Sequence, residues 1–237
     1  MILRGISFLF IFIFLFAHDS PYLLDKFKCV LNNAKLQAPL SAYNPLYSRK
    51  YGDFENYSNK YFYLQDNKYL VFYMCGFHHR SELRFKNEWS VNTDKAKILE
   101  AEVKLLPLNS QKEFTFLQIH ADSTLKNKPI INKPLLRIVW YKELHNKYNH
   151  IWAVIRQSED VNRKKYIKID LGLMPKGFFK VKILVQNNVL IIYVNNKKKV
   201  NIDVSYWNKY LNYFKAGVYL QDDGCAKVLF KQLKIKE

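Results

Sequence analysis

Three short segments carry hydrogen-bonding side chains on one side and apolar side chains on the other when they are given the two-residue period of a β-strand. The apolar sides, which include Leu83 and Phe85, suit the core of a β-sandwich. The three expected polar faces consist of Arg80, Glu82 and Arg84; of Phe114, Phe116, Gln118 and His120; and of Tyr213, Lys215, Gly217, Tyr219 and Gln221.

Arginine, glutamine, histidine and tyrosine together suit the binding of a carboxylate and the movement of a proton. The guanidinium presents a planar fork to a carboxylate, and the glutamine amide donates a hydrogen bond. Histidine and tyrosine can exchange protons. An ordinary solvated strand face more often carries lysine, glutamate, serine and threonine. The segments therefore predict a site that binds an acidic group and transfers a proton.

The rest of the sequence indicates many short β-strands and little helix. Residues 20–60 show no helical period, because Pro39, Pro45 and Gly52 interrupt them. Asparagine pairs at 187–188 and 195–196 predict tight hairpin turns. Strands at regular spacing predict an all-β, two-sheet antiparallel sandwich. The expected strands are 69–75, 98–105, 113–120, 135–141, 151–156, 178–185 and 189–194.

Residues 1–20 are predicted to be a secretory signal peptide. Arg4 gives a charged start, residues 8–17 are an apolar run, and His18, Asp19 and Ser20 are polar. The run is shorter than the roughly 20 apolar residues that a membrane-spanning helix needs. We therefore expect residues 21–237 to form one domain that is secreted or periplasmic, without stable membrane insertion.

The chain is strongly basic, with a formal net charge of +18. Such a charge attracts polyanions, whether nucleic acid, anionic membrane or acidic polysaccharide. A lysine-rich composition can also reflect the base composition of a genome. Charge alone does not choose among these partners.

The cysteine and histidine positions argue against a metal site and a disulfide scaffold. Cys29, Cys75 and Cys225 leave at least one thiol unpaired, and none lies in a CxxC pair. One disulfide is permitted, but the sequence does not identify its two members. His78 and His79 are adjacent, so on a strand they point to opposite faces and cannot easily share one ion.

Three motifs in these segments resemble the signatures of the polysaccharide lyase family 7 alginate lyases. They are Arg80-Ser81-Glu82-Leu83-Arg84, Gln118-Ile119-His120 and Tyr213-Phe214-Lys215-Ala216-Gly217-Val218-Tyr219, in the order found in the family. The resemblance extends from about residue 25 to the C-terminus. It implies a β-jelly-roll whose concave sheet forms a substrate groove. One departure is Leu220, where the family usually has Asn, and the strand period points Leu220 to the apolar side.

By position, the resemblance implies a catalytic group of Arg80, Gln118, His120 and Tyr219. It implies that Glu82, Arg84, Tyr213, Lys215 and Gln221 bind substrate. No metal and no cofactor are implied. The expected substrate is an acidic polysaccharide, alginate or a related polyuronate, and the expected state is a monomer that binds no nucleic acid.

The implied reaction is β-elimination, which removes the C5 proton of a 4-linked uronate and expels the C4 oxygen. Arg80, Gln118 and His120, the last either protonated or neutral, are the candidate donors that neutralise the carboxylate so that C5–H becomes acidic. Tyr219 is the expected proton carrier, with a pKa lowered by Lys215 and the arginines. In the family's usual account the tyrosine is base and acid for mannuronate, whereas His120 is the base for guluronate and Tyr219 the acid.

Two alternatives stay open at this stage. A carbohydrate-binding module could keep the same fold without turnover, and a lyase could act on another polyuronate such as glucuronan. The isoleucine in Gln118-Ile119-His120 is typical of a subtype associated with guluronate-containing blocks. Nucleic-acid binding rests on charge alone, and secretion disfavours it.

Overall fold

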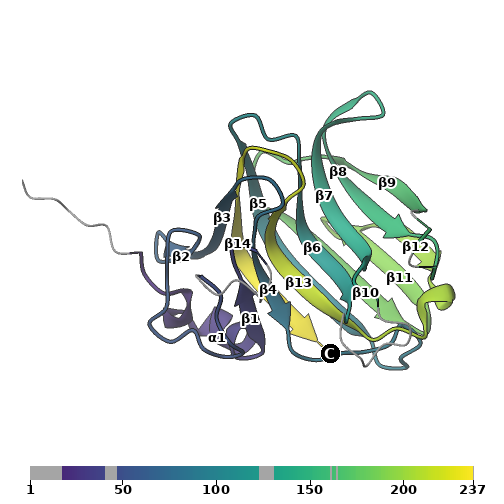
Figure 1. Cartoon of the computed structure of the whole chain (residues 1–237), viewed down its shortest axis with the longest axis horizontal. Helices are drawn as coiled ribbons and strands as arrows, with labels where there is room; N and C mark the ends of the chain where they lie inside the picture. The colour runs from purple at the N-terminus through teal and green to yellow at the C-terminus, as the bar shows by residue number, and fades with distance from the viewer. Residues whose placement is uncertain (1–17, 41–46, 123–130, 161, 164, 237) are drawn as a thin grey trace, which may run out of the picture.

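A computed structural model describes residues 18–40, 47–122, 131–160, 162–163 and 165–236; the predicted signal peptide lies mostly outside these residues. The described residues form two seven-stranded antiparallel sheets that face each other (Figure 1). The front sheet consists, in order, of β1 (Ala34–Gln37), β4 (Arg80–Phe85), β13 (Asn212–Leu220), β6 (Glu113–Ala121), β7 (Pro134–Leu144), β8 (Lys147–Arg156) and β9 (Tyr166–Leu173).

The back sheet consists, in order, of β12 (Lys197–Asp203), β11 (Val189–Val194), β10 (Phe179–Gln186), β5 (Lys97–Leu108), β14 (Cys225–Lys236), β3 (Tyr69–Cys75) and β2 (Phe62–Gln65). The antiparallel sandwich predicted from sequence is therefore confirmed. Two of the expected strands, 69–75 and 189–194, have the predicted bounds, and the others differ from them at one or both ends.

The predicted asparagine turns are confirmed by their backbone conformation. Asn187 and Asn188 have φ of 49° and 62°, and Asn195 and Asn196 have φ of 47° and 64°. Two positive φ values in a row are the signature of the type I′ hairpin turn, and asparagine tolerates them well.

Helix is scarce among the described residues, as predicted, but the expectation that residues 20–60 lack a helix was wrong. Helix α1 spans Asp25–Asn32, and short 3-10 turns span Pro21–Leu23 and Ser205–Trp207. Helix α1 buries Phe27, Val30 and Leu31, which recur at the spacing of one helical face. None of the described helices is long and apolar enough to cross a membrane.

The core lies between the two sheets. With one exception, the side chains that were predicted to be apolar and polar on the three strands lie on the expected faces. Leu83, Phe214, Ala216 and Leu220 are buried in the main apolar cluster, so the alternate side chains of their strands face outward from the sandwich.

The exception is the pair Phe114 and Phe116, which were expected beside Gln118 but are fully buried in the core. A β-bulge causes this difference. The pairing of β6 with β7 shifts register between Thr115 and Leu117, which adds one residue and restarts the alternation. Phe116 therefore packs against Phe179 of the back sheet, at 6.3 Å between ring centroids.

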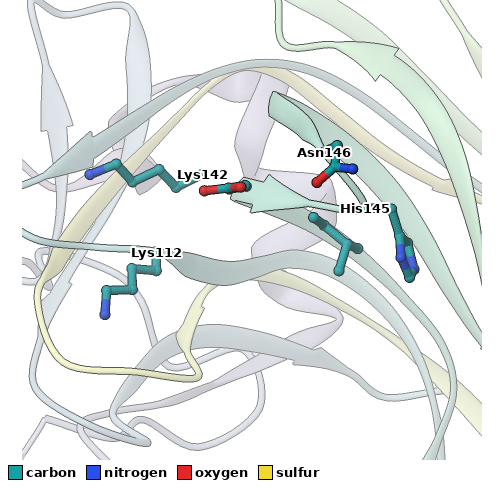
Figure 2. A pocket seen from close by; sticks show the side chains of 6 residues that line it. Lys112, Lys142, His145 and Asn146 are labelled. Atoms are coloured by element: carbon teal, nitrogen blue, oxygen red, sulfur yellow. The ribbon is translucent and has the colours of Figure 1, made fainter.

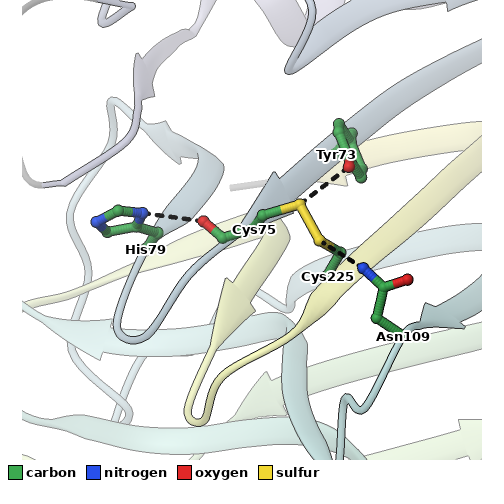
Figure 3. Close-up of a disulfide and its surroundings, with 5 residues drawn as sticks. All are labelled: Tyr73, Cys75, His79, Asn109 and Cys225. Carbon is green, nitrogen blue, oxygen red and sulfur yellow. Dashed lines mark hydrogen bonds between the residues drawn. A yellow bond between two sulfur atoms is a disulfide. The ribbon is translucent and has the colours of Figure 1, made fainter.

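A disulfide joins Cys75 at the end of β3 to Cys225 at the start of β14, where the two residues are direct cross-strand partners (Figure 3). Cys29 is free and exposed. The structure thus assigns the pair that the sequence left open. The disulfide lies where the chain leaves the back sheet toward β4 of the front sheet.

Candidate active site

The centre of the outer face of the front sheet holds a buried ion pair. The Lys215 ammonium lies 2.5 Å from the Glu82 carboxylate, and the two residues are 1% and 0% exposed. Gln118 donates a hydrogen bond from Nε2 to the other Glu82 oxygen. Arg80 lies 3.8 Å from Glu82, but its side chain keeps 22% of its exposure. Adjacent strands β4, β13 and β6 bring these four groups together.

Glu82 and Lys215 therefore differ from the expectation that both bind substrate directly. Each has the other as its main partner, and neither reaches solvent to a useful extent. Burial lowers the pKa of Lys215 to about 8, with Arg80 and Arg84 adding repulsion and Glu82 opposing the shift. The pair orients Gln118 and Arg80 from below the accessible surface.

Tyr219 lies beside Arg80, its cross-strand partner, with the guanidinium carbon 4.4 Å from the ring centroid. Burial raises the pKa of Tyr219 above its ordinary value, and Arg80 lowers it by less. The expectation of a lowered tyrosine pKa was wrong, because burial outweighs the effect of Arg80, whose guanidinium lies over the ring face, and because Lys215 is paired with Glu82. Tyr219 is therefore a protonated phenol at neutral pH.

His120 is held as a neutral imidazole with a defined tautomer. Its Nδ1 lies 2.8 Å from the Ala121 carbonyl, which can only accept, so Nδ1 carries the proton. The Tyr213 hydroxyl lies 3.3 Å from the same nitrogen, and the two rings stack. Burial, followed by repulsion from Lys215, lowers the pKa of His120 to about 3. With the proton on Nδ1, the lone pair of the neutral ring is on Nε2.

Arg84 and Tyr213 form a second cation–aromatic pair at the end of the site. The Arg84 guanidinium lies 3.9 Å from the Tyr213 ring centroid and makes ion pairs of 3.0 Å with Glu88 and Asp122. Burial raises the pKa of the Tyr213 phenol. These contacts fix Tyr213 and, through it, the ring of His120.

Gln221 donates a hydrogen bond from Nε2 to Thr115, and so ties the end of β13 to β6. Leu220 is fully buried in the core, as its place in the strand period predicted. The replacement of asparagine by leucine therefore changes packing and leaves the outer face unaltered.

Two contributors to the site were not predicted. Arg137 on β7 is the cross-strand partner of Gln118 and adds a further cation, 3.6 Å from Glu113. His78, in the loop before β4, places Nδ1 3.2 Å from the Tyr219 hydroxyl. Arg137 could be recognised as the single charge in the expected apolar strand 135–141, whereas the sequence shows His78 only as a neighbour of His79 and gives no sign of its contact with Tyr219.

Two surface hollows lie apart from these residues. One, at the β7–β8 hairpin, has Lys112 and Lys142 on one side and His145 and Asn146 on the other (Figure 2). The other lies on the back sheet and is lined by Lys180, Lys182, Tyr193 and Asn196. Across the described parts of the chain, no group of three histidine, cysteine or acidic residues could hold a metal ion.

Comparison with known proteins identifies this arrangement. A sequence model described as alginate lyase matches residues 30–237. The chain belongs to the alginate lyase family. An alginate lyase from Photobacterium sp. (strain ATCC 43367) is 35% identical over 215 residues, which cover 77% of this chain and 74% of that protein.

Solved structures agree with this family assignment. Alginate lyase AlyC3 is 30% identical with a TM-score of 0.81, covering 93% of this chain and 96% of its own. Alginate lyase A1-II′, described as a member of polysaccharide lyase family 7, has a TM-score of 0.73 at 20% identity, over 87% and 95% of the two chains. This alginate lyase family member is thus a polysaccharide lyase with a jelly-roll sandwich fold.

Proposed function

We propose that this enzyme cleaves alginate by β-elimination, with Arg80 and Gln118 binding the uronate carboxylate, His120 as base and Tyr219 as acid. The observation that carries the proposal is the opposite protonation of the two proton carriers. His120 is a neutral imidazole whose Nε2 carries the lone pair, and Tyr219 is a protonated phenol. They lie on neighbouring strands, together with the two carboxylate donors.

The carboxylate must be neutralised before the C5 proton can leave, because elimination places further negative charge on that group. Arg80 combines a fixed cation with partial exposure of its side chain. Gln118 is 2% exposed and uses one amide hydrogen on Glu82, so a carboxylate that binds at the base of the site, above the ion pair, would meet its second amide hydrogen. Arg80 and Gln118 together form a donor pair of the kind that stabilises an enolate-like intermediate.

The two protonation states favour guluronate as the residue attacked. In guluronate the C5 proton and the C4 oxygen lie on opposite sides, so two separate groups are needed. A neutral His120 can take the proton, and a protonated Tyr219 can give one to the leaving oxygen. Arrival of an anionic carboxylate offsets the repulsion from Lys215 and makes His120 a stronger base.

A second candidate is cleavage at mannuronate, where the tyrosine alone takes and returns the proton. It is favoured by AlyC3, whose structure solved in complex with dimannuronate is 29% identical to this chain. In this case Tyr219 must first lose its proton, against the direction in which burial shifts its pKa.

The remaining properties follow from the same proposal. Positive charge from Arg80 and Arg137 performs the neutralisation that a metal would otherwise supply, so the reaction is proposed to need no metal and no cofactor. A monomer secreted to the extracellular space or periplasm, which neither inserts in a membrane nor binds nucleic acid, is consistent with a polymeric substrate.

The test is the ultraviolet absorbance of the conjugated double bond during separate incubations with polyguluronate, polymannuronate and glucuronan, with and without EDTA. The proposal expects the fastest rise with polyguluronate and no effect of EDTA. Tyr219→Phe should reduce the rate by about 10²–10⁴-fold. Tyr148→Phe, which alters an exposed tyrosine, is the matched control and should retain the wild-type rate. A flat trace on all three polymers with folded wild-type protein would overturn the proposal.

A further inference from the structure

The loop between β3 and β4 places a second histidine on the reacting phenol. His78 Nδ1 lies 3.2 Å from the Tyr219 hydroxyl, and the two rings are nearly parallel with centroids 6.2 Å apart. His78 is exposed, whereas Tyr219 is only partly accessible. The imidazole therefore connects the phenol directly to solvent.

The backbone holds His78 in this position by several independent contacts. Residue 78 has a φ of 58°, a left-handed conformation that histidine adopts more readily than most residues. The carbonyl of His79 accepts a hydrogen bond from the amide of Leu220, next to Tyr219 in the chain. Gly76 donates to Gly224 at 3.0 Å, beside the Cys75–Cys225 disulfide. The loop and the end of β13 thus form one connected unit.

His79 has a separate and purely local contact. Its Nδ1 lies 2.9 Å from the Cys75 carbonyl, so its ring is committed to the base of the loop (Figure 3). The two adjacent histidines therefore have different partners, and only His78 reaches the proposed acid. This difference provides an internal control.

The proposed reaction leaves Tyr219 without its proton at the end of each turnover. When Tyr219 protonates the leaving oxygen, its O–H bond breaks and a phenolate remains beside Arg80. The proton taken from C5 is on His120, whose Nδ1 is bonded to Ala121. Before the next turnover His120 must release a proton, and Tyr219 must gain one from solvent.

We propose that His78 carries this proton between solvent and the Tyr219 oxygen, and so resets the phenol between turnovers. The inference rests on the proposed role of Tyr219 as the acid. The imidazolium of His78 gives its Nδ1 proton to the phenolate, which leaves a neutral ring with its remaining proton on Nε2. The exposed ring then turns Nδ1 toward solvent, gains a proton there from hydronium, and turns back to Tyr219. Proton number is balanced, because the proton lost by His120 to solvent equals the one gained through His78. His78 acts through Tyr219 and is a positioning and proton-carrying residue.

The charged groups around this pair lie on several elements. Arg80 on β4 contacts the Tyr219 ring, and Glu82 lies next to Arg80. Arg137 on β7 and Glu113 on β6 also act on the Tyr219 phenol. Phe77 packs its ring 3.8 Å from that of His78 and adds no charge. The pH dependence of the His78–Tyr219 pair is therefore set within a mixed field in which Arg80 is the nearest cation.

The decisive variant is His78→Gly, because glycine keeps the left-handed backbone and leaves a space that imidazole can fill. We expect kcat to fall by roughly tenfold with little change in KM, since water is a poorer carrier. In a plot of kcat against pH, the rise at low pH and the fall at high pH should both shift relative to wild type. Added imidazole should restore most of the rate. His79→Gly, which disturbs the same loop, should show no imidazole rescue.

A second measurement needs no activity. The ¹⁵N chemical shift of His78 Nδ1 should change in Tyr219→Phe, while that of His79 should not. Absence of this change, or a kcat profile of His78→Gly identical to that of active wild-type enzyme, overturns the inference. Inactive wild-type enzyme on every polymer would instead refute the proposed function, and the nitrogen shift would still decide whether His78 and Tyr219 form their hydrogen bond.

Discussion

The Lys215 ammonium and the Glu82 carboxylate lie 2.5 Å apart on neighbouring strands, and both side chains are almost fully buried. Removing two charges from water costs free energy, and the attraction between them offsets this cost only while both charges are present. Glu82 also accepts a hydrogen bond from the side-chain amide of Gln118. The ion pair therefore couples the stability of the sheet to the position of a proposed carboxylate-binding group.

The first prediction concerns the loss of one member of this pair. Glu82→Gln leaves the Lys215 ammonium buried without a counter-charge, and should lower the free energy of unfolding by about 3–5 kcal/mol in urea titrations. Glu100→Gln is the matched control, because its ion pair with Lys182 is exposed and contributes about 0–1 kcal/mol.

A further double variant separates charge from packing. Lys215→Met in the Glu82→Gln background removes the orphaned charge, and should recover much of the lost stability. It should not recover the lyase rate, since Gln118 has lost its carboxylate partner. Equal stability of Glu82→Gln and Glu100→Gln would contradict the importance of the buried pair.

The second prediction concerns Gly217 on β13, whose cross-strand partner on β4 is Glu82. Its φ is 148°, and an added Cβ would collide with the Ser81 carbonyl and lie 2.7 Å from Glu82 Cα. Gly217→Ala should therefore cost more than the roughly 1–3 kcal/mol typical of backbone strain alone. Gly177→Ala meets no atom within 4 Å and should stay within about 0.5 kcal/mol of wild type. Chemical denaturation of both variants is the measurement.

Strand periodicity predicted the polar faces of β4 and β13 from sequence alone, because polar and apolar side chains alternate along each of these two strands. The bulge in β6 could not be seen in this way. The register shifts at Phe116 against the strands on both sides, and alternation counts only positions along one strand. Phe114 and Phe116 were therefore assigned to the wrong face, while Gln118 and His120 were not affected.

The electrostatics of the site were beyond sequence reasoning for a related reason. Glu82 and Lys215 are separated by 133 positions, and only their pairing in space neutralises the lysine that was expected to act on Tyr219. The contact of His78 with Tyr219 likewise depends on a left-handed loop residue. Sequence indicates which groups are present, whereas the pKa of each depends on burial and on the nearest partner.

The third prediction is a pH dependence of stability from His120. Its pKa is lowered to about 3 in the folded protein, against about 6.5 in an unfolded chain. Between these values the unfolded state binds more protons, so the stability contributed by neutral His120 falls as the pH decreases through this window. Wild type should lose about 2 kcal/mol more than His120→Gln between pH 7 and pH 5. Parallel losses in urea titrations would contradict the neutral state of His120 in the folded protein.

The fourth prediction concerns the Cys75–Cys225 disulfide, which closes a loop of 150 residues. Replacing both cysteines by serine frees the unfolded chain, and should lower the free energy of unfolding by about 2–5 kcal/mol. For a chain of this length that corresponds to a fall of roughly 10 °C in Tm. Cys29→Ser removes only an exposed free thiol and should leave Tm unchanged.

Because Gly76 and Gly224 adjoin the disulfide, the loop that holds His78 should also become looser in the double cysteine variant. At a temperature where the double variant is fully folded, kcat should therefore fall toward the value of His78→Gly, whereas an unchanged kcat would show that the loop is held by its hydrogen bonds alone.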